Sequence, residues 1–211
     1  MEQQSDSPVK SFYNQQFSYL CYCIELPEVF LILLYVFFII KFVEYIYCAH
    51  IRSQPPLVSS NHGLRRLVLK QIHTYYPYAK NICEIGSGLG GFARYIAKNT
   101  DANVYALENM PFTVLGARFF DFIMGSRSKT IWCDAFEWLN KTNKKIDVAI
   151  AYMEPSSTTR LTKYKNKIRV IISLDFEIEK MRPTRVIDLG CGYTLYNHKK
   201  YPHRVFVYEL Q

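Results

Sequence analysis

The chain has 211 residues, of which 49% are hydrophobic and 16% aromatic, so it holds enough apolar material for one domain with a full core and an appendage. This composition excludes a disordered tail and a disulfide-stapled miniprotein. A formal net charge of +8 favours an anionic partner without distinguishing nucleic acid from lipid. The six cysteines show no CxxC spacing and the histidines no ligand spacing, so we expect reduced thiols and no metal site.

The first feature of the chain is an unbroken apolar run at 29–40, VFLILLYVFFII. Extending this run past Lys41 and Glu44 gives about 20 residues, the length that a helix needs to span a bilayer. Lys41 and Glu44 lie on one helical face near the exit end, where lysine can snorkel and the two can pair. We therefore expect a leader at 1–25 and a membrane-anchor helix at 26–51. An in-plane or oligomerising helix and an ordinary buried helix remain alternatives.

A composition change marks the end of the anchor. Residues 52–56 contain two prolines and predict a linker to a domain over 57–211. Cations follow the apolar run at Arg52 and Arg65, whereas Glu28 precedes it. The positive-inside rule therefore predicts a membrane protein with a single N-terminal span and its domain in the cytoplasm or a matrix.

From residue 57 onward, helical periodicity alternates with short β-rich runs. The expected helices include 64–72, 92–99, 111–124 and 156–166, and the expected strands are 81–85, 103–107, 129–133, 146–151 and 168–174. Such alternation predicts an α/β fold with a Rossmann-like, mostly parallel sheet covered by helices. The last two runs, 184–190 and 203–210, leave no room for a long helix between them. They predict an antiparallel strand pair that closes the sheet.

The strongest chemical signal is the sequence EIGSGLGG at 84–91, between the first strand and a helix. Glycines there let the backbone approach a ligand closely, and the helix N-terminus adds N–H donors. Gly86, Gly88 and Gly91 satisfy GxGxxG, and Glu108 ends the second strand as the acid of a dinucleotide fingerprint does. Because a carboxylate there can accept both ribose hydroxyls of any adenosine, Glu108 alone leaves the cofactor open.

Three observations favour S-adenosyl-L-methionine over NAD as that cofactor. Glu84 stands where a carboxylate could receive the ammonium of a methionine moiety and would repel a pyrophosphate. Asp134 follows the third strand, where a carboxylate can meet the exocyclic amine of adenine. No second domain remains to hold a hydride acceptor. The alternatives are an ordinary strand-to-helix turn for the glycines and solvated loop positions for the two carboxylates.

At these residues the chain resembles the class I S-adenosylmethionine-dependent methyltransferases over 57–211. The resemblance implies a seven-stranded sheet whose last strand is antiparallel. Within that superfamily the chain is most similar to the membrane-anchored lysine methyltransferases that act on the ATP synthase c-subunit and the adenine nucleotide translocase, and to their bacterial relatives. The N-terminal apolar segment, ENMPFTV at 108–114 and the aromatic strand VFVYE at 205–209 carry this likeness. Those relatives usually have an acidic residue where this chain has Leu89.

The resemblance also implies the cofactor site. Its residues are Glu84, Gly86, Ser87, Gly88, Gly90, Glu108, Asn109, Asp134 and Ala135. Glu84 and the glycines would surround the methionine end of the cofactor. Glu108 would bind the ribose, and Asp134 with Ala135 would face the adenine.

The acceptor side is less defined. After the fourth strand the chain reads AYMEPS, without the Asn/Asp-Pro-Pro-aromatic signature of enzymes that methylate conjugated amines of bases and glutamine. Glu154 in this segment is the candidate catalytic residue, which would orient an amine; a plain loop carboxylate is the alternative. A second match to a methyltransferase motif, VIDLGCG at 186–192, has too little chain after it for a cofactor domain. We expect a strand end and turn there.

Basic residues gather at 160–169, where Leu161, Tyr164 and Ile168 predict the apolar stripe of a helix with the cations on its solvent face. Anionic lipid accounts for these cations at least as well as nucleic acid does, so nucleic acid is not the expected partner. The leading hypothesis is a membrane-tethered methyltransferase acting on lysine of a membrane protein. The alternatives are a small-molecule or lipid-headgroup methyltransferase and a non-catalytic, membrane-associated binding module.

Overall fold

The chain divides into two compact units, Met1–Gln54 and Pro55–Gln211. The computed structural model describes residues 28–40, 42–43, 62–193 and 200–210. In the first unit, 28–40 and 42–43 are helical. The expected leader and linker, and the remainder of the expected anchor helix, lie outside the described residues. Among the residues that are described, no helix is both long and apolar enough to cross a membrane.

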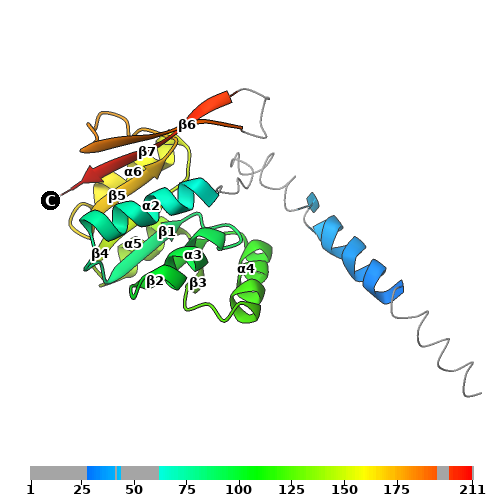
Figure 1. The fold of residues 1–211 in the computed structure, drawn as a ribbon. Helices are drawn as coiled ribbons and strands as arrows, with labels where there is room; N and C mark the ends of the chain where they lie inside the picture. The colour runs from blue at the N-terminus through cyan, green and yellow to red at the C-terminus, as the bar shows by residue number, and fades with distance from the viewer. Residues whose placement is uncertain (1–27, 41, 44–61, 194–199, 211) are drawn as a thin grey trace, which may run out of the picture. The chain divides into compact units, whose positions relative to one another are not determined.

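The second unit is built on a seven-stranded sheet in the order β3-β2-β1-β4-β5-β7-β6 (Figure 1). The strands are β1 Asn81–Ile85, β2 Asn103–Glu108, β3 Lys129–Trp132, β4 Ile146–Ala151, β5 Ile168–Leu174, β6 Arg185–Tyr193 and β7 Lys200–Glu209. Strands β1 to β5 pair in parallel, and β7 runs antiparallel to β5 and β6 between them. The predicted mostly parallel sheet with an antiparallel C-terminal pair is confirmed.

One helix precedes β1, and the others connect the parallel strands. They are α2 His62–Tyr75, α3 Gly91–Asn99, α4 Pro111–Ile123, α5 Ala135–Lys141 and α6 Pro155–Arg160, with the 3-10 helix η2 Leu161–Tyr164. The expected helix at 156–166 is therefore α6 followed by η2. Ile168, which was expected on the apolar stripe of that helix, belongs to β5 instead. The expected solvent position is also wrong for Lys167, because its Nζ donates to the carbonyls of Leu139, Asn140 and Thr142.

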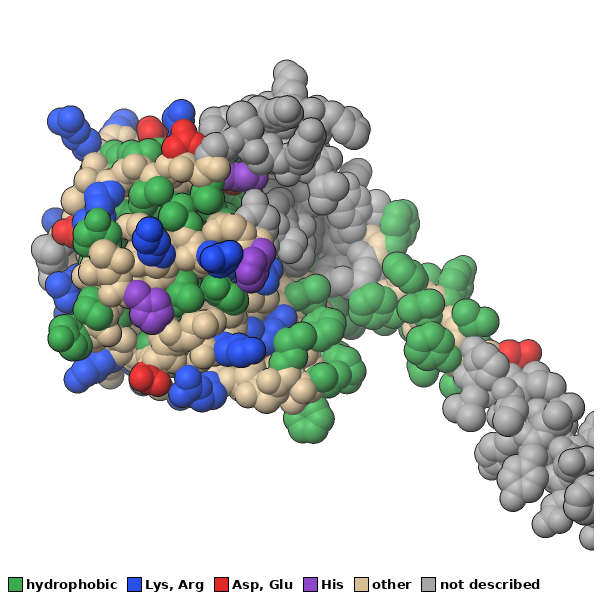
Figure 2. All heavy atoms as spheres, in the orientation of Figure 1, with side chains coloured by type: hydrophobic (Ala, Val, Ile, Leu, Met, Phe, Trp, Pro, Cys, Tyr) green, Lys and Arg blue, Asp and Glu red, His purple; other side chains and the backbone are tan. Residues whose placement is uncertain are grey.

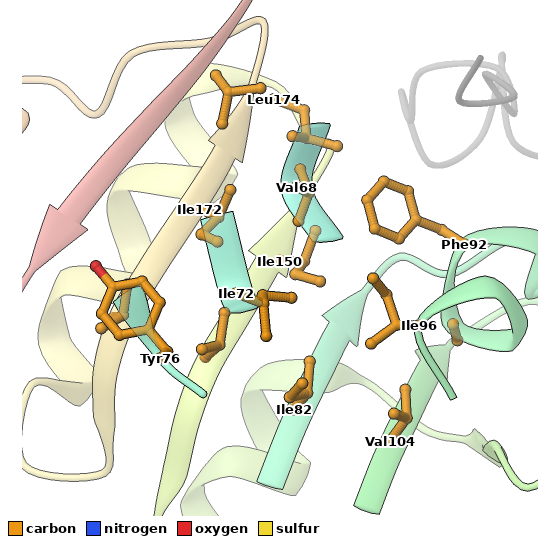
Figure 3. Close-up of a cluster of buried hydrophobic side chains, with 14 of the residues drawn as sticks. Val68, Ile72, Tyr76, Ile82, Phe92, Ile96, Val104, Ile150, Ile172 and Leu174 are labelled. Carbon is orange, nitrogen blue, oxygen red and sulfur yellow. The ribbon is translucent and has the colours of Figure 1, made fainter. Parts of the chain in front are cut away.

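Two apolar layers enclose the sheet. On one face, Leu64, Val68 and Ile72 of α2 pack with Phe92 and Ile96 of α3 against alternate residues of the strands (Figure 3). On the other face, α5 and η2 contribute the buried residues Leu139 and Leu161. Because the strands are covered on both sides, they read as nearly continuous apolar runs. Both layers are made of residues of the second unit.

The second glycine motif, at 186–192, lies inside β6. This strand continues to Tyr193 and pairs with β7, with a register shift between Asp188 and Cys191. The expectation of a strand end and turn after Asp188 is therefore wrong. Its exclusion as a cofactor loop agrees with the fold, because the motif lies within a strand instead of between a strand and a helix.

Candidate functional site

The candidate site lies where the order of the strands reverses. β1 pairs with β2 on one side and with β4 on the other. The chain leaves β1 into α3 and leaves β4 into α6, and these helices belong to opposite faces of the sheet. In open α/β sheets, ligands bind in the crevice outside the carboxyl ends of the strands at such a switch point. The glycine-rich segment after β1 occupies this position.

The backbone of the glycine loop explains its composition. Gly86, Gly88 and Gly90 have φ angles of 70°, 54° and 72°, the left-handed region that glycine enters without steric cost. The N–H groups of Gly86 and Ser87 donate to the Leu107 carbonyl at 2.9 and 3.0 Å, which ties the loop to the end of β2. The loop is therefore held close to β2 in a shape that side chains at these glycines would strain.

Ser87 is buried in this loop, with only 7% of its surface exposed. Within the described part of the chain, its Oγ has no hydrogen-bond partner. A buried polar group without a partner costs about 1–3 kcal/mol, and an acceptor on a ligand would remove that cost. The hydroxyl is an observation of this structure that fits a ligand with polar oxygens in the crevice.

Glu84, at the end of β1, is buried beneath the N-terminus of α3. Its Oε2 accepts a hydrogen bond from the Ala93 N–H at 2.8 Å. Burial raises the pKa of Glu84 to about 8, although this N–H and the charge of Arg65 act in the opposite direction. Arg65 lies over the start of α3, since a Cβ on Gly91 would be 3.0 Å from its Nη2. A cationic ligand group beside Glu84 would favour the ionised carboxylate.

Glu108, at the end of β2, joins the glycine loop to the next segment. Its Oε2 accepts from the Gly88 N–H at 2.8 Å, and its Oε1 accepts from the N–H groups of Asn109 and Met110 at 2.8 and 3.0 Å. A carboxylate has about four lone-pair positions, so capacity remains for a ligand hydroxyl. Sequence reasoning did not foresee this bracing role.

Asp134 caps α5. Its Oδ1 accepts from the N–H groups of Phe136 and Glu137 at 2.8 and 3.0 Å. The Cys133 N–H donates to the Glu108 carbonyl at 3.0 Å, which places the Asp134 backbone beside the end of β2, and Ala135 is the first residue of α5. An acid followed three residues later by Glu137 is a capping signature that could have indicated this role. The expected contact with adenine stays a prediction.

Glu154 is exposed at the N-cap position of α6, and its Oε1 accepts from the hydroxyls of Ser156 and Ser157 at 2.8 and 3.3 Å. Its neighbour Met153 faces the glycine loop, because a Cβ on Gly86 would lie 3.7 Å from the Met153 Cγ. The segment after β4 therefore borders the crevice. A catalytic role for Glu154 stays a prediction.

A polar cluster that sequence reasoning missed follows β4 and β5. The Tyr152 hydroxyl donates to Asp175 Oδ2 at 2.8 Å, and His203 Nδ1 lies 2.9 Å from the same oxygen. Asp175 Oδ1 accepts a hydrogen bond from the Arg204 N–H. The φ angle of Asp175 is 63°. Burial raises the pKa of Tyr152 above its usual value. This cluster ties the segments after β4 and β5 to β7, next to Met153. The sequence signal for it is the position of Tyr152 and Asp175 directly after two strands; His203, inside β7, has none.

No family model and no curated protein matches this sequence. Solved structures do resemble the fold. An RNA methyltransferase from Salinibacter ruber, in complex with S-adenosyl-L-homocysteine, is 18% identical over 72% of this chain and 94% of that chain, with a TM-score of 0.58. A putative O-methyltransferase from Klebsiella pneumoniae is 16% identical over 76% and 85% of the two chains, with a TM-score of 0.55.

A precorrin-6Y C5,15-methyltransferase from Geobacter metallireducens is 13% identical over 73% of this chain and 91% of that chain, with a TM-score of 0.54. At these identities the likeness concerns the fold. The second unit therefore has the Rossmann-like fold of class I S-adenosylmethionine-dependent methyltransferases, as the resemblance predicted.

Proposed function

We propose that the chain is an S-adenosylmethionine-dependent methyltransferase. The observation that carries this proposal is the buried hydroxyl of Ser87, which has no hydrogen-bond partner among the described residues. It lies in a loop of left-handed glycines that follows the buried carboxyl of Glu84. An amino-acid moiety offers both complements, a carboxylate for the hydroxyl and an ammonium for Glu84. The fold supports the same class, and the Salinibacter ruber protein of this fold was solved with S-adenosyl-L-homocysteine.

The residues of this chain would hold the cofactor from end to end. Glu84 and Ser87 would bind its methionine end, and Glu108 the ribose hydroxyls. Because Asp134 uses Oδ1 for its cap, its other oxygen would meet the adenine amine. When bound, S-adenosylmethionine supplies a methyl group on a sulfonium, which is already activated, so the protein contributes mainly positioning and exclusion of water.

The hydrogen bonds of the loop disfavour NAD. A dinucleotide pyrophosphate is bound by free N–H groups of such a loop. Here several of these groups already donate within the protein, namely those of Gly86, Ser87, Gly88 and Gly90. Only the protonated form of Glu84 could donate a hydrogen bond to a phosphate, and the ionised form would repel it. We therefore expect the loop to select against a pyrophosphate.

Calorimetry with the full chain tests the cofactor. We expect S-adenosylhomocysteine to bind and NAD to give no heat of binding under the same conditions. Binding of NAD without a response to S-adenosylhomocysteine would overturn the assignment. A folded chain that binds neither ligand would also count against it.

We further propose that the acceptor is a lysine amine on a membrane protein. Methyl transfer to lysine needs the neutral amine, and a carboxylate such as Glu154 beside Met153 can orient it and accept its proton. The apolar helical residues at 29–40 support a membrane tether, which would raise the effective concentration of substrates in the same bilayer. The domain would then face the cytoplasm or a matrix.

A labelled methyl donor identifies the acceptor. The full chain is incubated with membranes, and label is measured separately in protein, lipid extract and RNA, followed by mass spectrometry of the labelled fraction. Label on lysine supports the proposal. Label in the lipid extract or in RNA would show that the acceptor is a lipid or an RNA and that the lysine proposal is wrong. Cofactor binding without transfer to any fraction would favour a non-catalytic binding module.

A further inference from the structure

Helix α4 has a second apolar face that is exposed. This face is made of Phe112, Leu115, Phe119, Phe122, Ile123 and the following Met124, which we call the α4 apolar face. Phe122 is 85% exposed and Leu115 66%. Figure 2 shows hydrophobic side chains gathered in the region of the domain where Figure 1 places α4. A surface of this kind usually marks an interaction site.

The core does not account for the α4 apolar face. The residues with which α4 packs on the sheet are Thr113, Val114 and Ala117, and all three are buried. A helix on the surface of a soluble domain normally carries polar residues on the side away from the core. The sequence of α4 instead places aromatic and aliphatic side chains there, which is unusual for a surface that stays in water.

Exposed cations lie within α4 and shortly after it. The acid within α4, Asp121, is engaged by Arg94 at 3.1 Å and by the Thr130 hydroxyl at 2.6 Å. Arg118, within α4, is exposed, and its guanidinium donates to the Thr130 carbonyl at 3.3 Å. Arg127, shortly after α4, is exposed, donates to the carbonyls of Ala97 and Thr100 at 3.0 Å and forms a solvent-exposed ion pair with Asp101 at 3.9 Å. A carbonyl acceptor leaves the charge of Arg118 uncompensated, and an exposed ion pair contributes only about 0–1 kcal/mol. Apolar side chains beside cations are the pattern of an element that lies in the interface of an anionic bilayer. In a symmetric pairing of two copies, the same cations would face one another.

We propose that the α4 apolar face docks onto the interface of a bilayer that contains anionic lipid. Leu89 extends this surface to the glycine loop, because a Cβ on Gly116 of α4 would lie 3.1 Å from Leu89 Cδ2 and Leu89 itself is 37% exposed. The candidate cofactor site then lies next to the lipid surface. This docking is independent of methyl transfer and of the apolar segment at 29–40.

Quenching by brominated lipid tests the docking in the full chain. The variant F122W carries a tryptophan on the α4 apolar face, and Y78W carries one at a residue that is 90% exposed before β1, away from α4. The signal of the added tryptophan is obtained by difference from the parent chain with its two native tryptophans. Vesicles of brominated phosphatidylcholine with and without phosphatidylserine are compared.

We expect the added fluorescence of F122W to be quenched in vesicles with phosphatidylserine, more weakly in phosphatidylcholine alone, and that of Y78W to remain. Absence of quenching for F122W in vesicle-bound protein would overturn the proposal. The proposal is also wrong if the unquenched F122W protein is a dimer and the additional substitution L115E makes it monomeric, because a second copy of the chain then covers the α4 apolar face. Calorimetry with S-adenosylhomocysteine on the same samples reports the proposed function separately.

Discussion

Glu84 couples ligand binding to pH, because burial raises its pKa to about 8. In the free protein near neutral pH its carboxyl is mostly protonated. A bound ammonium favours the ionised form, so binding must release this proton below the raised pKa. As pH rises from about 6 to 8, we expect the Kd for S-adenosylhomocysteine to fall by up to about tenfold per pH unit and then to level off.

Calorimetry in two buffers with different heats of ionisation measures the released proton directly. We expect about one proton per ligand at pH 7 in the parent chain and none from this position in E84Q. An affinity that does not change with pH in the parent chain would show that Glu84 does not receive the ammonium.

Glu108 supports both the ligand and the loop, through its hydrogen bond to the Gly88 N–H. Losing a charge-assisted contact costs about 1.5–3 kcal/mol, so E108A should weaken S-adenosylhomocysteine binding by roughly 10- to 100-fold. The control is E137A, which removes an exposed glutamate paired with Lys141 on α5. Unchanged affinity in folded E108A would place Glu108 outside the site.

At the scale of elements, Asp134 has a structural role as the N-cap of α5 that can be measured apart from its proposed role in binding adenine. D134A removes the acceptor for the Phe136 and Glu137 N–H groups and should lower the free energy of unfolding by about 0.5–2 kcal/mol. D134N keeps an oxygen acceptor at the cap and should be nearly neutral. Urea denaturation of both variants measures the difference. No loss of stability in D134A would show that the cap does not stabilise α5, whereas equal losses would assign the effect to the charge of Asp134 instead of its acceptor oxygen.

Strands and helices differ in how well local sequence predicted them. The bounds of β1, β4 and β5 agree with their apolar runs, because strands buried on both faces are marked by composition alone. Helix α5 was missed since it has only 7 residues and one buried side chain, Leu139. The helix expected at 156–166 was too long. Ile168 matches the helical periodicity of this segment, but in the fold it begins β5 and pairs with Ile146 of β4, so strand pairing decides its conformation.

At the scale of the whole molecule, the apolar run at 29–40 predicts attachment of the chain to membranes. Extended past Lys41, it reaches about the 20 residues that span a bilayer. We expect the full chain to stay in the membrane fraction after carbonate extraction and the chain from Pro55 to be released. If the full chain is released, the segment lies in the interface instead, since each central charge costs about 2.5–3.5 kcal/mol.

The sequence by itself determined the α/β alternation, the position of the glycine loop and the antiparallel end of the sheet. These features depend on local periodicity, on glycine and on the lengths of connections, all of which are properties of neighbouring residues. The same reasoning selected Glu84 and Glu108, because the ends of strands and the glycine motif can be recognised from the sequence pattern.

Only the tertiary structure decided what those side chains do. The hydrogen bond between Glu108 and Gly88 and the shared carboxylate of Asp175 join residues that are distant in sequence. The Ser87 hydroxyl is buried by the fold and has no partner within the part of the chain that the structure describes. The exposed α4 apolar face is also visible only in the tertiary structure, because the sequence of a helix does not show which of its apolar residues another element covers. Pairing and burial are set by packing between elements, which local pattern leaves open.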